Sequence, residues 1–404
     1  MKLIQILTEA VRQKASDVHL KIGIPPMVRV HGNLRLIYPG ADPISKELIE
    51  EICAQLLNEK TLAELQQNKE VDVAYSISKL GRFRANLFQQ RGSVALVIRN
   101  IPYHIPSLGE LCLPPVIEKL TDLDRGLILF TGETGSGKST SLASFVNTIN
   151  KKYQKHIITI EDPIEYLVPD HKSVITQREV GVDTAGFQAA LRASLRQDPD
   201  VILIGELRDA ETIETAMMAA ETGHLVLSTL HTLDTKEAIL RILSYFQPYQ
   251  HGQIQLQLTT CLKAIVSQRL LSRKDGSGFV PAVEVMVNNS RVSEYIMQLD
   301  RLKEITTAIE ESHTSYGMQS FDQSLAMLLK EGHIDETEAL KASTSPGDFE
   351  LKLKGIYSLS RNDFRAGEDI AVKDEQTLLK MQLETVYKKE ESDPSIKLHR
   401  KKKI

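Results

Sequence analysis

The sequence predicts an α/β protein with two domains, a smaller mixed α+β domain followed by a larger domain built on a parallel β-sheet. Up to about residue 100, the expected strands alternate apolar and polar residues, which is typical of half-buried strands. Beyond residue 121, short and wholly apolar runs alternate with helical stretches, which is typical of parallel strands covered on both faces. A length of 404 residues agrees with two or three domains of ~150 residues each.

The composition narrows the class of protein. Hydrophobic residues make up 42% and charged residues 25% of the chain, which is ordinary for a globular protein. The net charge of −4 argues against a strongly basic nucleic-acid binder, although a local basic patch stays open. The three cysteines, Cys53, Cys112 and Cys261, form no CxxC pair, so neither a zinc ribbon nor a disulfide framework is expected. A reducing, cytosolic setting fits this usage.

The first domain is expected over residues 1–100. Apolar residues at helical spacing begin it, and we expect an amphipathic helix that packs on its own domain, with a membrane-surface helix as the alternative. Glu9 and Arg12 interrupt this segment, so it is not expected to be a signal peptide. A helix is expected over 46–67. Strands are expected at 17–23, 27–37, 71–77, 81–90 and 93–101. Four prolines in 101–120 indicate a linker.

The second domain is expected over residues 121–357. Its buried parallel strands are expected at 127–130, 156–160, 201–205 and 224–229. From about 250 to 345 the pattern is mostly helical, with one strand at 279–287. Hydrophobic density falls after Pro346, and the chain ends in KLHRKKKI. We therefore expect residues 358–404 to form a charged, largely disordered tail.

One motif predicts a nucleotide site. GETGSGKS, Gly132–Ser139, matches G-x-x-x-x-G-K-[ST] and lies between an apolar strand and a helical pattern. Its glycines let backbone N–H groups turn toward phosphate oxygens, and the helix N-terminus favours negative charge. Lys138 is expected to reach the β- and γ-phosphates of ATP, and Ser139 to hold Mg²⁺. The phosphate-binding positions are Gly132, Glu133, Thr134, Gly135, Ser136, Gly137, Lys138, Ser139 and Thr140.

Polar residues follow the other apolar runs, where ligands gather in open α/β sheets. VILIGE ends in Glu206, which is expected to order Mg²⁺ or its water. IEDPIEY supplies Glu161, Asp162 and Glu165, one of which could polarise the attacking water, although a solvated loop is the alternative. His224 and His231 flank the fourth run, and at least one could sense the γ-phosphate.

Four ordered motifs resemble those of a known family. GETGSGKST, IEDPIEY, LRASLRQDPDVILIGELRD and TGHLVLSTLHT resemble the Walker A, Asp box, Walker B and His box of the secretion ATPases of type II secretion and type IV pili. The likeness covers roughly residues 1–355. The retraction branch, the PilT/PilU type, fits best, because there is room for one domain before the P-loop, because no tetracysteine module is present, and because GMQSFDQSLAMLLKEGHI resembles its C-terminal helices.

The resemblance implies a ring of six chains, each with a PAS-like first domain and a RecA-like ATPase domain. It implies that Glu165 is the general base, supported by Glu161 and Asp162, that Glu206 is the Walker B acid, and that His224 and His231 form the His box. Arginines on strands of the first domain reach a nucleotide in such ATPases; here they are Arg82, Arg84 and Arg99. The spacing of the motif does not decide whether Glu161 or Glu165 is the general base. The alternative is that Arg82, Arg84 and Arg99 are surface arginines on an edge strand with no contact to a nucleotide.

The implied partners are a second copy of the chain, an inner-membrane pilus platform protein and a paralogous retraction ATPase, with no nucleic acid. The implied location is the cytoplasmic face of the inner membrane. One helix departs from the pattern. Where retraction ATPases carry an AIRNLIRE-like segment, this chain has NSRVSEYIMQ, which keeps Arg291 and lacks the second arginine. The main motor, an accessory subunit and an extension or secretion ATPase therefore stay open, and a nucleic-acid motor is the remaining alternative.

Overall fold

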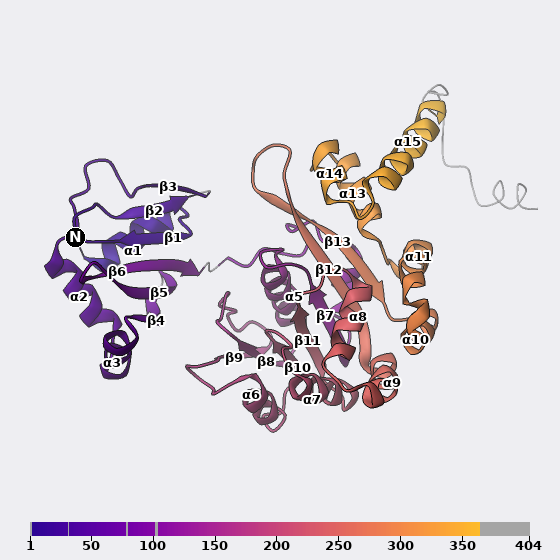
Figure 1. The fold of residues 1–404 in the computed structure, drawn as a ribbon, viewed down its shortest axis with the longest axis horizontal. Helices are drawn as coiled ribbons and strands as arrows, with labels where there is room; N and C mark the ends of the chain where they lie inside the picture. The colour runs from indigo at the N-terminus through magenta and orange to yellow at the C-terminus, as the bar shows by residue number, and fades with distance from the viewer. Residues whose placement is uncertain (1, 31, 78–79, 102–103, 364–404) are drawn as a thin grey trace, which may run out of the picture. The chain divides into compact units, whose positions relative to one another are not determined.

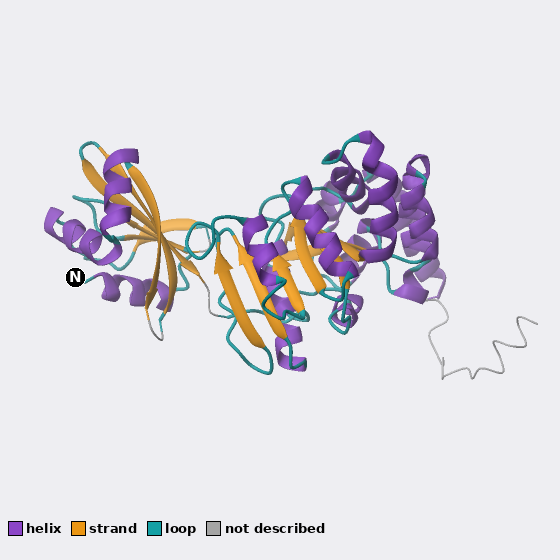
Figure 2. Ribbon diagram, turned by 90° about the horizontal axis from the view of Figure 1, so that it is seen from below, coloured by secondary structure: helices purple, strands orange, loops and turns teal. Residues whose placement is uncertain are grey.

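The fold is described from a computed structural model, which covers residues 2–363 apart from 31, 78–79 and 102–103. The chain divides after Pro346 into two units. The larger unit holds two β-sheets with their helices, and both appear in Figure 1 and Figure 2. The tail was expected over residues 358–404, and most of it, residues 364–404, lies outside the described residues. Helix α15 (Pro346–Asp363) continues past residue 358, where the tail was expected to begin.

The first sheet has six antiparallel strands in the order β3-β2-β1-β6-β5-β4. Its strands are β1 (Asp17–Leu20), β2 (Met27–Val30), β3 (Asn33–Leu36), β4 (Glu70–Ile77), β5 (Gly81–Gln90) and β6 (Ser93–Ile101). Alternate residues of β5 are buried, as the sequence pattern predicts. Its helices are α1 (Leu3–Arg12), α2 (Lys46–Leu56) and α3 (Glu59–Asn68). The single helix expected over 46–67 is two helices, because Leu57 is extended and Asn58 caps α3.

The second sheet has seven strands in the order β13-β12-β7-β11-β10-β8-β9, and only β13 runs antiparallel to its neighbour among the described residues. Its strands are β7 (Gly126–Thr131), β8 (His156–Glu161), β9 (Val174–Glu179), β10 (Val201–Ile204), β11 (Leu225–Leu230), β12 (Leu262–Ser272) and β13 (Phe279–Val287). The four expected parallel strands are β7, β8, β10 and β11, and every residue of β7, β10 and β11 is buried.

Helices cover both faces of this sheet. Side chains of α4 (Pro115–Leu120) and α5 (Lys138–Lys152) share one apolar core with one face. The other face packs against α6 (Phe187–Ser194), α7 (Ala210–Glu221), α8 (Thr235–Ser244), α9 (His251–Cys261), α10 (Ser290–Met297) and α11 (Ile305–Glu311). The remaining helices are α12 (His313–Tyr316), α13 (Phe321–Lys330) and α14 (Glu336–Ala342), and the 3₁₀ turns are η1 (Pro248–Gln250) and η2 (Leu299–Glu304). Across the described residues, every helix is too short or too polar to cross a membrane.

The expectation that residues 250–345 are mostly helical, with a single strand at 279–287, is wrong for β12. This strand lies between β7 and β13 in the sheet, and most of its residues are buried. It follows α9 directly, with Cys261 ending the helix and Leu262 beginning the strand. Since neither glycine nor proline stands at this junction, the sequence carries no break signal there. Sheet pairing, a long-range effect, decides the conformation.

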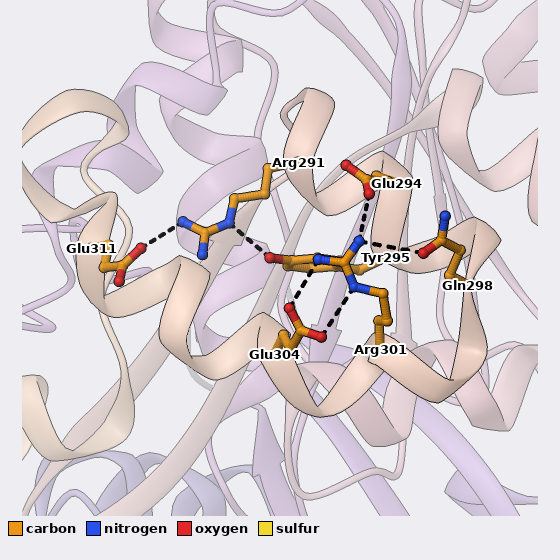
Figure 3. Close-up of polar contacts among 7 residues, drawn as sticks. All are labelled: Arg291, Glu294, Tyr295, Gln298, Arg301, Glu304 and Glu311. Atoms are coloured by element: carbon orange, nitrogen blue, oxygen red, sulfur yellow. Dashed lines mark hydrogen bonds and ion pairs between the residues drawn. The ribbon is translucent and has the colours of Figure 1, made fainter.

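A charged network joins α10, η2 and α11 (Figure 3). Tyr295, which is 2% exposed, is at its centre. The guanidinium of Arg301 lies 4.6 Å from the centroid of the Tyr295 ring, and Arg291 donates to the tyrosine oxygen at 2.8 Å. Three carboxylates accept from these arginines: Glu311 from Arg291, and Glu294 and Glu304 from Arg301. Arg301, ten residues after Arg291 in the chain, supplies the second guanidinium of this network.

Candidate nucleotide-binding site

The loop between β7 and α5 has the backbone geometry of a phosphate-binding loop. Gly132 has a φ of +143°, and a Cβ there would lie 2.4 Å from the Gln268 carbonyl oxygen. Gly135 and Gly137 also have positive φ values, +83° and +88°. Side chains are disfavoured at these positions by conformation, and at Gly132 by space as well. The glycine spacing of the motif is therefore required by the bend of the loop.

Lys138 begins α5 and lies beneath this loop. Its Nζ donates to the carbonyl oxygens of Gly132 and Glu133, both at 2.8 Å, and the residue is 7% exposed. Burial lowers the pKa of Lys138, and the carboxylates of Glu206 and Glu165 act in the opposite direction. The ammonium is thus held by neutral acceptors at present. A phosphate oxygen in the loop would offer it a charged acceptor, which makes a stronger hydrogen bond.

A cavity of about 550 Å³ opens beside the loop, at the carboxyl ends of the parallel strands. Eleven of the sequence-predicted site residues line it. They are Thr134, Gly135, Gly137, Lys138, Ser139, Thr140, Glu161, Asp162, Glu165, Glu206 and His231. Gly132, Glu133 and Ser136 lie on the other side of the same loop, around a second cavity. The sheet therefore gathers residues from β7, β8, β10 and β11 at one edge, as the parallel topology requires.

Glu206 follows β10 and is joined to two cationic or titratable groups. Arg208 Nε donates to Glu206 Oε2 at 2.7 Å, and His231 Nε2 lies 3.4 Å from Glu206 Oε1. Arg208 Nη1 also lies 3.7 Å from Asp162 Oδ2, so one guanidinium connects Glu206 to Asp162. The hydrogen bond to Glu206 raises the pKa of Arg208. The sequence prediction missed Arg208, whose signal was its place directly after the VILIGE strand.

The three acids of the Asp box have different surroundings. Glu161 lines the cavity but is partly buried, and its Oε1 accepts from Thr159 Oγ1 at 2.6 Å and from Gln177 Nε2 at 3.2 Å. Burial raises the pKa of Glu161. Asp162 faces Arg208, and Glu165 lines the cavity. Because Glu165 is exposed and lines the cavity, its position suits contact with a ligand.

The two histidines lie at opposite ends of β11. His231 follows the strand and lines the cavity. His224 precedes the strand, and its Nδ1 lies 2.9 Å from the Ala219 carbonyl oxygen. Since β11 runs parallel to β7, this position is at the edge of the sheet opposite the P-loop. Contrary to expectation, His224 does not lie at the cavity of its own chain, because only the carboxyl end of a parallel strand reaches that edge.

The three arginines of the first domain lie on β5 and β6, and each pairs with a carboxylate. The pairs are Arg82 with Glu179 at 2.7 Å, Arg84 with Asp72 at 3.3 Å, and Arg99 with Asp17 at 3.1 Å. Glu179 ends β9, and its Oε2 also accepts from the Ile164 N–H at 3.3 Å. Arg82 is therefore connected through one carboxylate to the backbone next to Glu165. Arg84 and Arg99 are held by acids of their own sheet.

A divalent cation fits the donor types at this edge. Ser139, Glu206, Glu165 and Asp162 offer oxygen atoms to the cavity, and hard cations such as Mg²⁺ prefer oxygen. Within the described residues there is no group of three or more His, Cys, Asp or Glu side chains that could hold a metal ion without help.

A P-loop, a strand-end acid and a cavity between them define the chain as a P-loop ATPase. The sequence profile of the family described as "Type II/IV secretion system protein" matches residues 1–294. The chain is 40% identical to the type IV pilus ATPase PilU of Pseudomonas aeruginosa, over 88% of this chain and 92% of that protein. It is 38% identical to the retraction ATPase PilT of the same organism, over 86% of this chain and all of that protein.

A crystal structure of the pilus retraction motor PilT with bound ADP is also similar. It superposes with a TM-score of 0.80 at 42% identity, over 87% of this chain and 99% of that one. The fold predicted from the resemblance, an N-terminal domain followed by an ATPase domain, is thereby confirmed. The chain belongs to the type II/IV secretion ATPase family.

Proposed function

We propose that this chain is an ATP-hydrolysing motor that retracts type IV pili as a ring of six copies. The observation that supports this most is the cavity at the sheet edge, where the P-loop, Glu165, Glu206 and His231 come together. Relatives named for pilus retraction and twitching motility match most of the chain. The proposed partners are further copies of the chain and an inner-membrane platform protein, at the cytoplasmic face of that membrane. A paralogous retraction ATPase is a third candidate partner.

The proposed chemistry assigns each side chain a role. The P-loop amides and Lys138 bind the phosphates, and Ser139 and Glu206 would hold Mg²⁺, which neutralises phosphate charge when bound. Glu165 takes a proton from the attacking water, since the Glu161 carboxylate already accepts hydrogen bonds from Thr159 and Gln177. Arg208 fixes the orientation of Glu206, and His231 lies close enough to respond to the γ-phosphate end of the ligand.

The proposed conversion of hydrolysis into motion uses the two domains. We place the domains at 1–100 and 121–357, with 101–120 as the linker between them and 358–404 as the tail. Arg82 is the arginine best placed to couple them, because its partner Glu179 also holds the Ile164 N–H beside Glu165. A change at the γ-phosphate would then alter the loop that Arg82 contacts. Arg84 and Arg99 remain candidates for contacts across a subunit boundary.

An accessory role within a retraction motor is the second candidate. It is favoured by the 40% identity to PilU and by the α10 segment, whose only arginine is Arg291. Arg301 contacts the same tyrosine ring from η2 (Figure 3), so the network holds two guanidinium groups by a different arrangement. The two candidates differ in whether the chain hydrolyses ATP and retracts pili without a paralogue.

Steady-state ATP hydrolysis measured against protein concentration tests the proposal. A rate per chain that rises with assembly and collapses in Glu165→Gln is the expected result. A wild-type rate near background would favour the accessory role, and stimulation by single-stranded DNA would favour a nucleic-acid motor. In cells, deletion should leave excess surface pili. Loss of pili on deletion would instead indicate an extension or secretion ATPase.

A further inference from the structure

Strand β9 is the last strand at one edge of the ATPase sheet. The segment before it, residues 162–173, carries Glu165 and contains neither helix nor strand, and we call it the Glu165 loop. Backbone groups in such a segment need partners other than those of a regular helix or strand. Gln177 and Glu179 of β9 supply some of these partners. They are two residues apart in a strand, so both side chains lie on the same face of the sheet.

Gln177 lines the cavity, and the Glu165 loop occupies both ends of its side-chain amide. Its Nε2 donates to the Tyr166 carbonyl oxygen at 2.9 Å and to Glu161 Oε1 at 3.2 Å, and its Oε1 accepts from the Val168 N–H at 2.9 Å. Only one orientation of the amide satisfies these groups, because two of them are acceptors and the third is a donor. Gln177 therefore holds the backbone at two points that follow Glu165.

Glu179 holds the loop just before Glu165, and helix α5 holds it just after. The Glu179 carboxylate accepts from the Ile164 N–H at 3.3 Å. The Tyr166 hydroxyl lies 3.0 Å from Thr140 Oγ1, in the first turn of α5. Both neighbours of Glu165 in the chain are thus fixed to other elements, while the Glu165 side chain is exposed and lines the cavity.

The contact between Gln177 and Glu161 connects the two acids of this region. Burial raises the pKa of Glu161, and hydrogen bonding from Thr159, from Gln177 and from the Glu165 backbone acts in the opposite direction. The Glu161 carboxylate therefore lies between the amide of Gln177 and the backbone of Glu165. Loss of the Gln177 amide would remove a partner of this carboxylate in addition to the two direct contacts with the loop backbone.

We infer that Gln177 is a positioning residue for ATP hydrolysis, which holds the Glu165 loop in the conformation that directs Glu165 into the cavity. This inference rests on the proposed role of Glu165 as the general base. Gln177 takes no proton itself, since an amide is a poor base and both of its polar atoms are already bound by the loop. Its effect comes from geometry, because a displacement of about 1 Å at a reacting group can slow a reaction about a hundredfold.

Kinetics of ATP hydrolysis by the full chain test the inference. Gln177→Met keeps the length of the side chain and removes all three contacts, so kcat should fall about thirtyfold while KM for ATP stays within about twofold. Thr176→Val is the matched control, because Thr176 precedes Gln177 in β9 and its hydroxyl contacts His156 on the opposite face. Its kcat should stay within about twofold of wild type.

A double variant tests whether Gln177 acts through Glu165. In single-turnover measurements, Gln177→Met combined with Glu165→Gln should be no slower than Glu165→Gln alone, because no base is left to position. Hydrogen exchange followed by mass spectrometry gives a measurement that needs no turnover. In Gln177→Met, exchange over residues 162–173 should be about tenfold faster or more, since the Val168 N–H loses its acceptor. Exchange over the P-loop, 132–140, should be unchanged, which also shows that the variant is folded.

Unchanged kcat or unchanged loop exchange in Gln177→Met would overturn the inference and leave the ATPase function intact. An increase in KM at constant kcat would also overturn it, since Gln177 would then act on binding. An equal fall of kcat in Thr176→Val, or independent effects in the double variant, would attribute the loss to a weakened edge strand. Full activity of Glu165→Gln would refute the proposed base and the inference with it, and wild-type hydrolysis near background would refute both together with the proposed function.

Discussion

Two charged regions of the ATPase domain differ in how their charges are satisfied. Around Tyr295, two arginines are each bound to carboxylates and to the buried ring between them (Figure 3). At the sheet edge, the Lys138 ammonium donates to two neutral carbonyl oxygens, although Glu206 and Glu165 lie near enough to affect the pKa of Lys138. The network is complete within the chain, whereas the edge has charge available for a ligand.

This difference separates structural from chemical roles. In the network the Tyr295 ring is buried while the charged side chains around it are partly exposed, so the stability of this region comes mainly from packing of the ring. At the edge the charged groups line a cavity, where they can interact with whatever enters. Substitutions at the edge should therefore change activity and leave stability intact, and substitutions in the network should do the reverse.

The largest effect is expected from Lys138→Met. Loss of the ammonium removes a charge-assisted contact to the phosphates, and the ATP hydrolysis rate should fall about a thousandfold. Burial lowers the pKa of Lys138, so the charged form is disfavoured in the folded chain, and an apolar side chain should leave the thermal midpoint equal or higher. Calorimetry and a coupled ATPase assay measure the two quantities. A large fall in the midpoint would show that this lysine is mainly structural.

Tyr295→Ala should produce the opposite pattern. It removes a buried ring, the stacking of Arg301 and the hydrogen bond from Arg291, and should lower the free energy of unfolding by about 3–5 kcal/mol. Urea unfolding measures this loss, and nucleotide affinity at low temperature should be unchanged. Tyr295→Phe, which removes only the hydroxyl, is the matched variant and should cost about 1 kcal/mol. A loss of affinity in the folded protein would connect the network to the site.

Arg208→Ala tests an arginine that lines the cavity and also pairs with carboxylates there, so its expected effect lies between the two above. Without its guanidinium, Glu206 and Asp162 lose a common partner, and the hydrolysis rate should fall about tenfold, or about 1.4 kcal/mol of barrier. Arg192→Ala is the control, because Arg192 pairs with Glu211 on the surface and such pairs contribute little. Equal rates in the two variants would remove Arg208 from the site.

The sequence predicted the residues at the carboxyl ends of the parallel strands better than it predicted strand β12 or the contacts around Tyr295. The strand-end positions of Lys138, Glu165 and Glu206 follow from motif and apolar run together, because a parallel strand delivers whatever follows it to one edge. His224 shows the limit of this rule, since a residue before a strand lies at the other edge. Strand β12 depends on pairing with β7, which is distant in the sequence, so no local pattern encodes it. Arg301 lies only six residues after Tyr295, but the helix between them ends at Met297, so their contact does not follow from helical spacing.

Glu161→Gln gives the smallest effect and distinguishes the two candidate bases. Burial raises the pKa of Glu161 above its ordinary value of 4.5, so the folded chain binds this proton more tightly than the unfolded chain. Stability from this group is therefore lost as pH rises above 4.5. The glutamine variant should be more stable than wild type at pH 8, with a difference that shrinks toward pH 4.5, as measured by urea unfolding across that range.

The exposed Glu214→Gln on α7 is the control and should show no such trend. Hydrolysis by Glu161→Gln should stay within severalfold of wild type, because the glutamine carbonyl can still accept from Thr159 and Gln177, and Glu165 remains to take the proton. Collapse of the rate in Glu161→Gln, with Glu165→Gln active, would assign the base to the buried acid. A buried carboxyl with a raised pKa would then be part of the chemistry, and complete pairing would no longer mark a structural charge in this protein.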